Sequence, residues 1–149
     1  MARWPKYLLP RASTSCGLSG RLGNRQKMDA GKLTRELELG VGMVTALLDG
    51  ISVAEARFKP TPETWSILEV LCHLYDEERE DFRQRLDILL HHPADPWPPI
   101  RPAEWVTERD YNSRDFEEMR RNWLEERQKS LDWLRGLENP DWEQSATAP

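Results

Sequence analysis

Thr64–Arg85 reads TWSILEVLCHLYDEEREDFRQR, and this stretch decides the fold class. Ser66 and Glu69 have the spacing of a capping box, in which the serine hydroxyl accepts a hydrogen bond from the backbone N–H three residues later and the glutamate reaches back. Trp65 and Val70 flank the cap with the spacing of a hydrophobic staple. A long helix is therefore predicted to begin at Ser66.

One further helix is predicted on each side of this segment. Apolar residues recur with the helical period from 33 to 51, while the central helix continues to about His91, where Pro93 stops it. Asn112 or Ser113 is placed to cap a third helix. The apolar stripe of that third helix is formed by Phe116, Met119, Trp123, Leu131 and Leu134.

Two segments that contain prolines separate these helices. Residues 51–64 and 94–105 are predicted to be irregular connections, because proline removes a helical hydrogen bond and restricts the residue before it. A helix with one apolar stripe needs partners to cover it, and antiparallel bundles commonly use four helices. The sequence therefore predicts an all-α, antiparallel helical bundle of the four-helix type whose fourth helix is missing.

Charge divides the chain into two parts. Residues 1–27 contain six basic residues and no acidic one. Since the net charge of the whole chain is −5, residues 28–149 carry a net charge of −11. The first part has no helical or strand periodicity and lacks the apolar core of a secretory signal. We predict that residues 1–28 form a basic disordered tail, with a mis-assigned start before Met28 and a targeting peptide as alternatives. Residues 29–149 are predicted to form the incomplete bundle.

The composition also limits the classes of function. An acidic body lacks the cationic face that nucleic-acid phosphates require, and no apolar run approaches the roughly 20 residues that span a bilayer. Two cysteines, Cys16 and Cys72, make no disulfide framework, which is typical of a reducing cytosol. Cys72 is interpreted as a core thiol. The sequence therefore predicts a cytoplasmic protein that binds neither nucleic acid nor membrane.

His73 is the first candidate for a functional residue. It lies beside the apolar face of the central helix, with Glu69 and Glu77 one turn away on either side. This pattern is compatible with a partial metal site, with an acid–base pair and with a solvated histidine on an acidic face. His91 and His92 cannot join His73 on one metal, because the intervening helix spans about 27 Å.

Charged residues also fall within the apolar stripes. Glu78 lies at the centre of a face whose other members are Ile67, Leu71, Leu74 and Phe82. Buried charges must be paired, so we predict that Glu78 pairs with Arg127 of the third helix or with Arg85. The pair is either an ion pair that sets the helix register or part of a substrate pocket. Trp97 and Trp105 are further candidates to line a pocket.

Residues 65–74 followed by Asp76, Glu78 and Arg85 resemble the W-S-x-x-E-x-x-x-H-L segment of the DinB-like/YfiT-like superfamily. The similarity extends through the proline-rich segment before Trp105 and through Arg127 to cover roughly residues 29–149. It implies a four-helix bundle with a divalent metal, typically nickel or zinc. The family binds this metal through one histidine of the second helix and an H-x-x-x-H pair of the fourth.

His73 matches the ligand of the second helix, whereas this chain contains no H-x-x-x-H. The resemblance therefore carries over one metal ligand of three. Glu77, Glu78, Arg85 and Arg127 are candidates to support that ligand or to form the buried pair. The sequence identifies no catalytic residue.

Two functions from different classes follow. The first is a metal-dependent hydrolase or thiol-dependent transferase scaffold for a small-molecule substrate, inactive or incomplete as given. In such a truncated chain the metal binds only if a completing chain supplies the other ligands. The second is a non-catalytic helical module that forms a homodimer through the apolar face that three helices leave exposed.

Overall fold

The computed structural model describes residues 29–144, so the predicted tail lies outside the described residues. The long helices are α1 (Ala30–Leu48), the continuous run of α3 (Ile67–Glu77), η1 (Glu78–Phe82) and α4 (Arg83–His91), and α6 (Phe116–Arg135). The short ones are α2 (Val53–Arg57), α5 (Pro102–Glu108) and η2 (Tyr111–Ser113). The described residues contain no strand, which confirms the all-α prediction. None of their helices combines the length and the hydropathy that a bilayer crossing requires.

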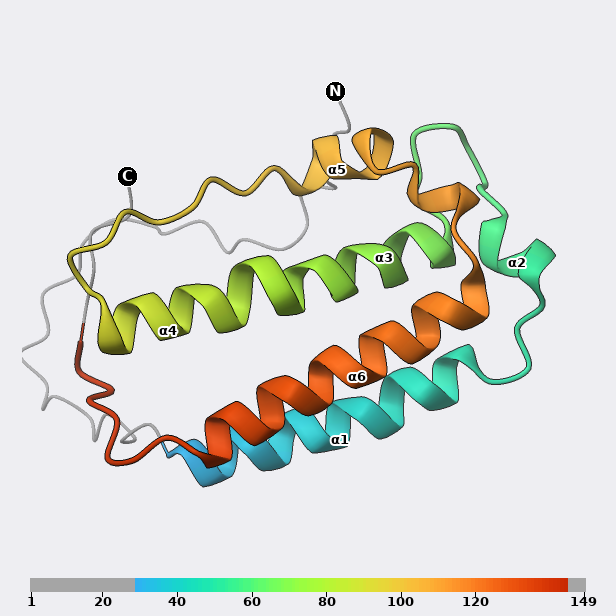
Figure 1. Ribbon diagram of the computed structural model, residues 1–149. Helices are drawn as coiled ribbons and strands as arrows, with labels where there is room; N and C mark the ends of the chain where they lie inside the picture. Colours follow the sequence, from blue (N-terminus) through green and yellow to red (C-terminus); the bar gives the residue numbers. More distant parts are fainter. Residues whose placement is uncertain (1–28, 145–149) are drawn as a thin grey trace, which may run out of the picture.

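The three long helices lie side by side with a distinctive order of directions (Figure 1). α1 runs antiparallel to both of the others. The run α3–η1–α4 and α6 point the same way, because residues 92–115 cross back along the whole bundle before α6 begins. The second proline-rich segment is therefore a crossover connection.

Local capping signals fix where the helices begin. The predicted capping box is confirmed, since Ser66 Oγ accepts from the Glu69 N–H at 3.1 Å and Glu69 Oε2 accepts from the Ser66 N–H at 2.8 Å. A second capping box, Ser52 with Glu55, begins the short helix α2 inside a segment predicted to be irregular. A complete cap can therefore support even a helix of five residues.

Two other boundaries differ from the prediction. Asp115, rather than Asn112 or Ser113, caps α6 by accepting from the backbone N–H of Glu118 at 2.7 Å. Pro102 begins α5 within the proline-dense segment, because proline is tolerated at the first position of a helix. Asn112 instead accepts a hydrogen bond from Ser66 Oγ at 2.7 Å, which fastens the end of the crossover to the start of α3.

The core lies mainly between α3 and α6. All five residues of the predicted α6 stripe are buried, with Trp123 2% and Phe116 1% exposed. Phe116, Met119 and Trp123 belong to one core cluster with the buried α3 side chains Leu68, Leu71 and Cys72. α6 also packs along α1, whereas α1 and α3 make few direct contacts. The bundle is therefore open between α1 and α3.

A π-turn at η1 changes which residues of the central helix face α6. Its wider turn holds one residue more than an α-helical turn, so the residues that follow are displaced by one position. Arg83 consequently faces α6, where it bonds Glu126 Oε2 at 2.8 Å and Ser130 Oγ at 3.1 Å. Phe82, predicted to lie on the apolar face, is displaced outward and is 57% exposed.

Candidate functional site

Four ionisable side chains form a row along one side of the central helix. His73, Glu77, Asp81 and Arg85 are spaced four residues apart, and we call them the His73–Arg85 row. His73 Nδ1 lies 3.6 Å from Glu77 Oε1, and Arg85 Nε lies 2.6 Å from Asp81 Oδ1. The side chains of His73 and Glu77 are only 17% and 9% exposed. The row is therefore largely removed from water.

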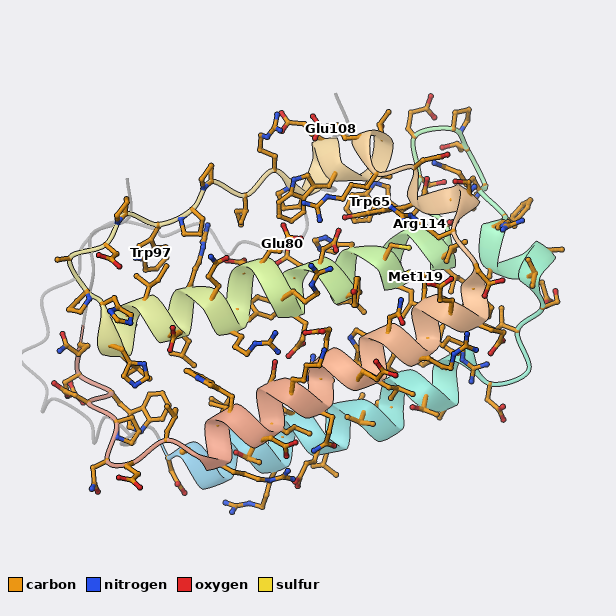
Figure 2. The ribbon with its side chains drawn as sticks, viewed as in Figure 1. Trp65, Glu80, Trp97, Glu108, Arg114 and Met119 are labelled. Carbon is orange, nitrogen blue, oxygen red and sulfur yellow. The ribbon has the colours of Figure 1, made fainter. Side chains whose placement is uncertain are left out.

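A tryptophan lies at each end of the row. The ring of Trp65, just before α3, meets the ring of His73 edge to face at 5.1 Å. Trp97, in the crossover, packs on the guanidinium of Arg85 at 4.9 Å, and Figure 2 shows it above α4. Trp97, which was predicted to line a pocket, thus contacts a residue of the row. Trp105 is buried and lies against Arg109 instead, at 4.1 Å.

The His73–Glu77 pair leaves buried polar atoms without hydrogen bonds. Nδ1 of His73 and Oε1 of Glu77 are both buried and unpaired, and their separation of 3.6 Å is too long for a hydrogen bond. Buried polar atoms in folded proteins normally have partners, so exceptions often mark a water, an ion or a functional group. Within the row, these two atoms face each other beyond hydrogen-bond distance, whereas Asp81 Oδ1 and Arg85 Nε lie 2.6 Å apart.

Burial also shifts the proton equilibria of the row. It lowers the pKa of His73, against the opposing effect of the Asp76 and Asp81 carboxylates. Burial raises the pKa of Glu77 to about 7, and Asp81 adds to this rise whereas Arg85 opposes it. At neutral pH the imidazole of His73 is therefore mainly uncharged, the form that has a lone pair for a metal or a proton.

Glu78 and Arg127 form a separate buried pair. Arg127 Nη2 lies 2.7 Å from Glu78 Oε2, with the two side chains 12% and 3% exposed. The structure thus shows the first of the two predicted pairings, and Arg85 contacts Asp81 rather than Glu78. The pair joins η1 to α6, so its direct effect is to hold the register of these two helices.

A second polar cluster on the central helix was not predicted. Tyr111 Oη donates to Asp76 Oδ2 at 2.5 Å, and Arg109 Nη1 donates to the same oxygen at 2.6 Å. Arg109 also makes two hydrogen bonds of 2.8 Å to Glu80, which lowers the pKa of Glu80. We call these four residues the Asp76 cluster. Arg109 and Tyr111 lie 33 and 35 residues beyond Asp76, and no local motif signals such a partnership.

The Asp76 cluster borders a cavity of about 350 Å³ between α3, the crossover and α6. Cys72 also lines this cavity but is 1% exposed, and burial raises the pKa of its thiol to about 12. The prediction of a core thiol is confirmed. None of the buried unpaired polar atoms of the described residues lies on this cavity.

Other polar residues near His73 have structural partners. Glu69, predicted to flank His73, accepts from Lys59 at 2.8 Å in addition to its role in the capping box. His91 lies 2.8 Å from Asp87, at the end of α4. Neither residue reaches the His73–Glu77 pair.

The described residues do not form a complete metal site. Within residues 29–144, no three His, Cys, Asp or Glu side chains are grouped so that they could hold a metal ion. Protein zinc sites use three or four protein ligands, whereas His73 and Glu77 are two. The donor set implied by the sequence resemblance is therefore only partly present among these residues.

Comparison with known proteins places this bundle in a family. A family model described as the DinB superfamily matches residues 36–149. The structure is also similar to YfiT from Bacillus subtilis, described as a probable metal-dependent hydrolase with an unusual four-helix bundle topology. That match has a TM-score of 0.70 at 17% identity and covers 95% of this chain and 74% of that chain. A search of curated proteins finds no match. The chain has the fold of the YfiT four-helix bundle, and it belongs to the DinB superfamily.

Proposed function

We propose that this protein uses Nε2 of His73 as one donor to a divalent metal, nickel or zinc. We place this site in a hydrolase or thiol-dependent transferase that acts on a small molecule. Membership of the DinB superfamily and the description of YfiT support this class of chemistry. Because residues 29–144 do not complete the donor set, the other donors come from outside them or from a completing chain.

The position of Glu77 behind His73 carries the proposal. A histidine that ligates a metal through one ring nitrogen usually donates its other N–H to a carboxylate, which fixes the ring and its tautomer. Nδ1 of His73 faces Oε1 of Glu77 at 3.6 Å, and neither atom has a hydrogen bond. This arrangement leaves Nε2 as the ring atom for the metal.

A cytoplasmic location is part of the same proposal. Cys72 is a free, buried thiol, which suits a reducing compartment.

Metal content of the purified full chain tests the proposal. After incubation with nickel or zinc and removal of the excess, the wild-type chain is expected to retain near-stoichiometric metal. His73→Ala is expected to lose at least about 10-fold in metal affinity, because a ligand is removed.

The double variant His91→Ala/His92→Ala is the matched control, since both histidines are exposed at the end of α4. It is expected to bind as the wild type does. Absence of metal from the wild type, or loss of metal only in the double variant, would overturn the proposal.

A further inference from the structure

The cavity beside the Asp76 cluster has charged side chains on its walls. Its space of about 350 Å³ lies between α3, the crossover and the start of α6, and a space of this size can hold a small molecule. Arg114 lies just before α6 and Met119 in the first turns of that helix (Figure 2). The charged lining residues are three arginines and three acids, namely Arg79, Arg109, Arg114, Asp76, Asp115 and Glu118.

One arginine and one acid of this set already neutralise each other. Arg109 donates to Asp76 Oδ2 at 2.6 Å, and it is held further by two bonds of 2.8 Å to Glu80. Asp76 Oδ1 lies 4.0 Å from Arg79 Nη1, which is too far for a hydrogen bond. The charges that remain for a ligand are therefore two arginines, Arg79 and Arg114, and two carboxylates.

Arg79 and Arg114 are held in place and still have unused donors. Arg79 Nη1 donates to Tyr75 Oη at 3.0 Å, and its guanidinium lies 4.9 Å from the centre of the Tyr75 ring. Arg114 donates from Nε and Nη2 to the backbone carbonyl of Arg109 at 3.1 and 3.0 Å. No hydrogen bond to a described residue uses Nη2 of Arg79 or Nη1 of Arg114. Such positioned guanidinium groups lose little freedom when they bind a carboxylate.

The wall formed by α6 has the opposite charge. Asp115, Glu118 and Asn122 follow one another at intervals of three and four residues, so they share one face at the start of α6. Asp115 Oδ1 caps the helix, whereas within residues 29–144 the side chains of Glu118 and Asn122 have no hydrogen-bond partner. Neither carboxylate forms an ion pair with Arg79 or Arg114. The cavity therefore separates two cations from two anions.

This separation is complementary to a small zwitterion. The lining charges cancel, so a simple anion would meet the carboxylates of α6 and a simple cation would meet the arginines. A molecule with a carboxylate at one end and an ammonium group at the other meets an opposite charge on each wall. Each end can then form charge-assisted hydrogen bonds, which are stronger than those between neutral groups.

We propose that this cavity binds a small amino acid, with its carboxylate between Arg79 and Arg114 and its ammonium group at Glu118. The Asp76 cluster serves as the fixed wall that holds Arg109, and through its carbonyl Arg114, in position. The site is separate from the metal proposed at His73, because no residue of the His73–Arg85 row lines the cavity.

Thermal unfolding of the full chain with amino acids tests the proposal. The probes are the twenty standard amino acids, together with β-alanine and γ-aminobutyrate, in which the two charges lie further apart. A probe present at about ten times its Kd is expected to raise the melting temperature by about 3 °C or more. His73→Ala is expected to show the same rise, which separates this site from the metal site. Absence of a rise with every probe would overturn the proposal.

Isothermal titration of the probe with the largest rise then assigns the two walls. Arg79→Gln and Glu118→Gln are each expected to weaken its binding at least about 10-fold, because each removes a charged hydrogen-bond partner. Both side chains are exposed, so the variants are expected to fold, and their melting temperatures without a probe check this. Arg121→Gln and Glu117→Gln are the matched controls, since both residues are exposed and line no part of the cavity.

A change in the probe completes the test. The amide of the same amino acid lacks the carboxylate charge and is expected to bind the wild type at least about 10-fold more weakly than the acid. It is expected to bind Arg79→Gln no more weakly than the wild type, because the interaction with Arg79 is already lost. An amide that binds as tightly as the acid, or cavity variants that bind as the controls do, would overturn the proposal.

Discussion

On one side of the central helix, Asp76 accepts hydrogen bonds from Tyr111 and Arg109, and every bond is short. On the adjacent side, His73 and Glu77 face each other at 3.6 Å without a hydrogen bond. Both sides bury polar groups, but only the first satisfies them. Because unpaired buried polar groups cost stability, a protein that keeps them generally has another use for them. The contrast separates a structural cluster from a candidate site on one helix.

The largest expected effect concerns stability on the paired side. Asp76→Ala removes the acceptor of a buried tyrosine hydroxyl and one partner of Arg109. We expect the free energy of unfolding to fall by about 2–4 kcal/mol, measured by urea denaturation. Metal binding at His73 should remain within a few-fold of the wild type.

Glu117→Ala is the control for Asp76→Ala. Glu117 pairs with Arg120 but is 55% exposed, so its loss should change stability by less than about 0.5 kcal/mol. Equal losses in the two variants would show that the Asp76 cluster is no more structural than a surface pair.

The next effect concerns metal affinity on the unpaired side. Glu77→Ala removes the carboxylate behind His73 and is expected to weaken nickel or zinc binding about 10–100-fold, by isothermal titration. Its effect on unfolding should be smaller than that of Asp76→Ala, because Asp76 accepts hydrogen bonds from Arg109 and Tyr111, whereas the polar neighbours of Glu77 are the Asp81 carboxyl and an imidazole 3.6 Å away. If Glu77→Ala lowers the free energy of unfolding but keeps full metal affinity, Glu77 is a structural residue and not a support for a metal ligand.

The smallest effect is a pH dependence on the paired side. The hydrogen bonds from Arg109 lower the pKa of Glu80 below its unfolded value of 4.5. The stabilisation is therefore present above that value and lost as pH falls through the folded pKa. Glu80→Gln is expected to flatten the decline of unfolding free energy below about pH 5, by less than about 1 kcal/mol because Glu80 is 33% exposed.

Glu117→Gln, at an exposed position, is the control for the pH measurement. It should leave the acid limb of the stability curve unchanged. If Glu80→Gln and Glu117→Gln behave alike, Arg109 does not bind the charged form of Glu80 in the folded protein.

Residues close in sequence explain what could be predicted. The capping box of Ser66 and Glu69 involves two residues three positions apart, so its hydrogen bonds form wherever that helix begins. The α6 stripe follows from the helical period in the same way, and its members are buried as predicted. His73 could be identified as a candidate because the segment that resembles the family, residues 65–74, is short and continuous in sequence.

The π-turn and the crossover explain what could not be predicted. Helical periodicity continued through residues 78–82 places Phe82 inward, whereas the extra residue of the turn places Arg83 there. The crossover brings Arg109 and Tyr111 to Asp76 from more than 30 residues away. Neither arrangement has a signal within one or two helical turns of sequence.

The sequence by itself determined the long helices, their apolar faces and the position of His73. It did so because capping bonds and helical spacing act between residues at most four apart. Only the tertiary structure decided which polar groups are paired, with Asp76 bound by the crossover and His73 left facing Glu77. It also decided that α6 packs against both α1 and the central helix.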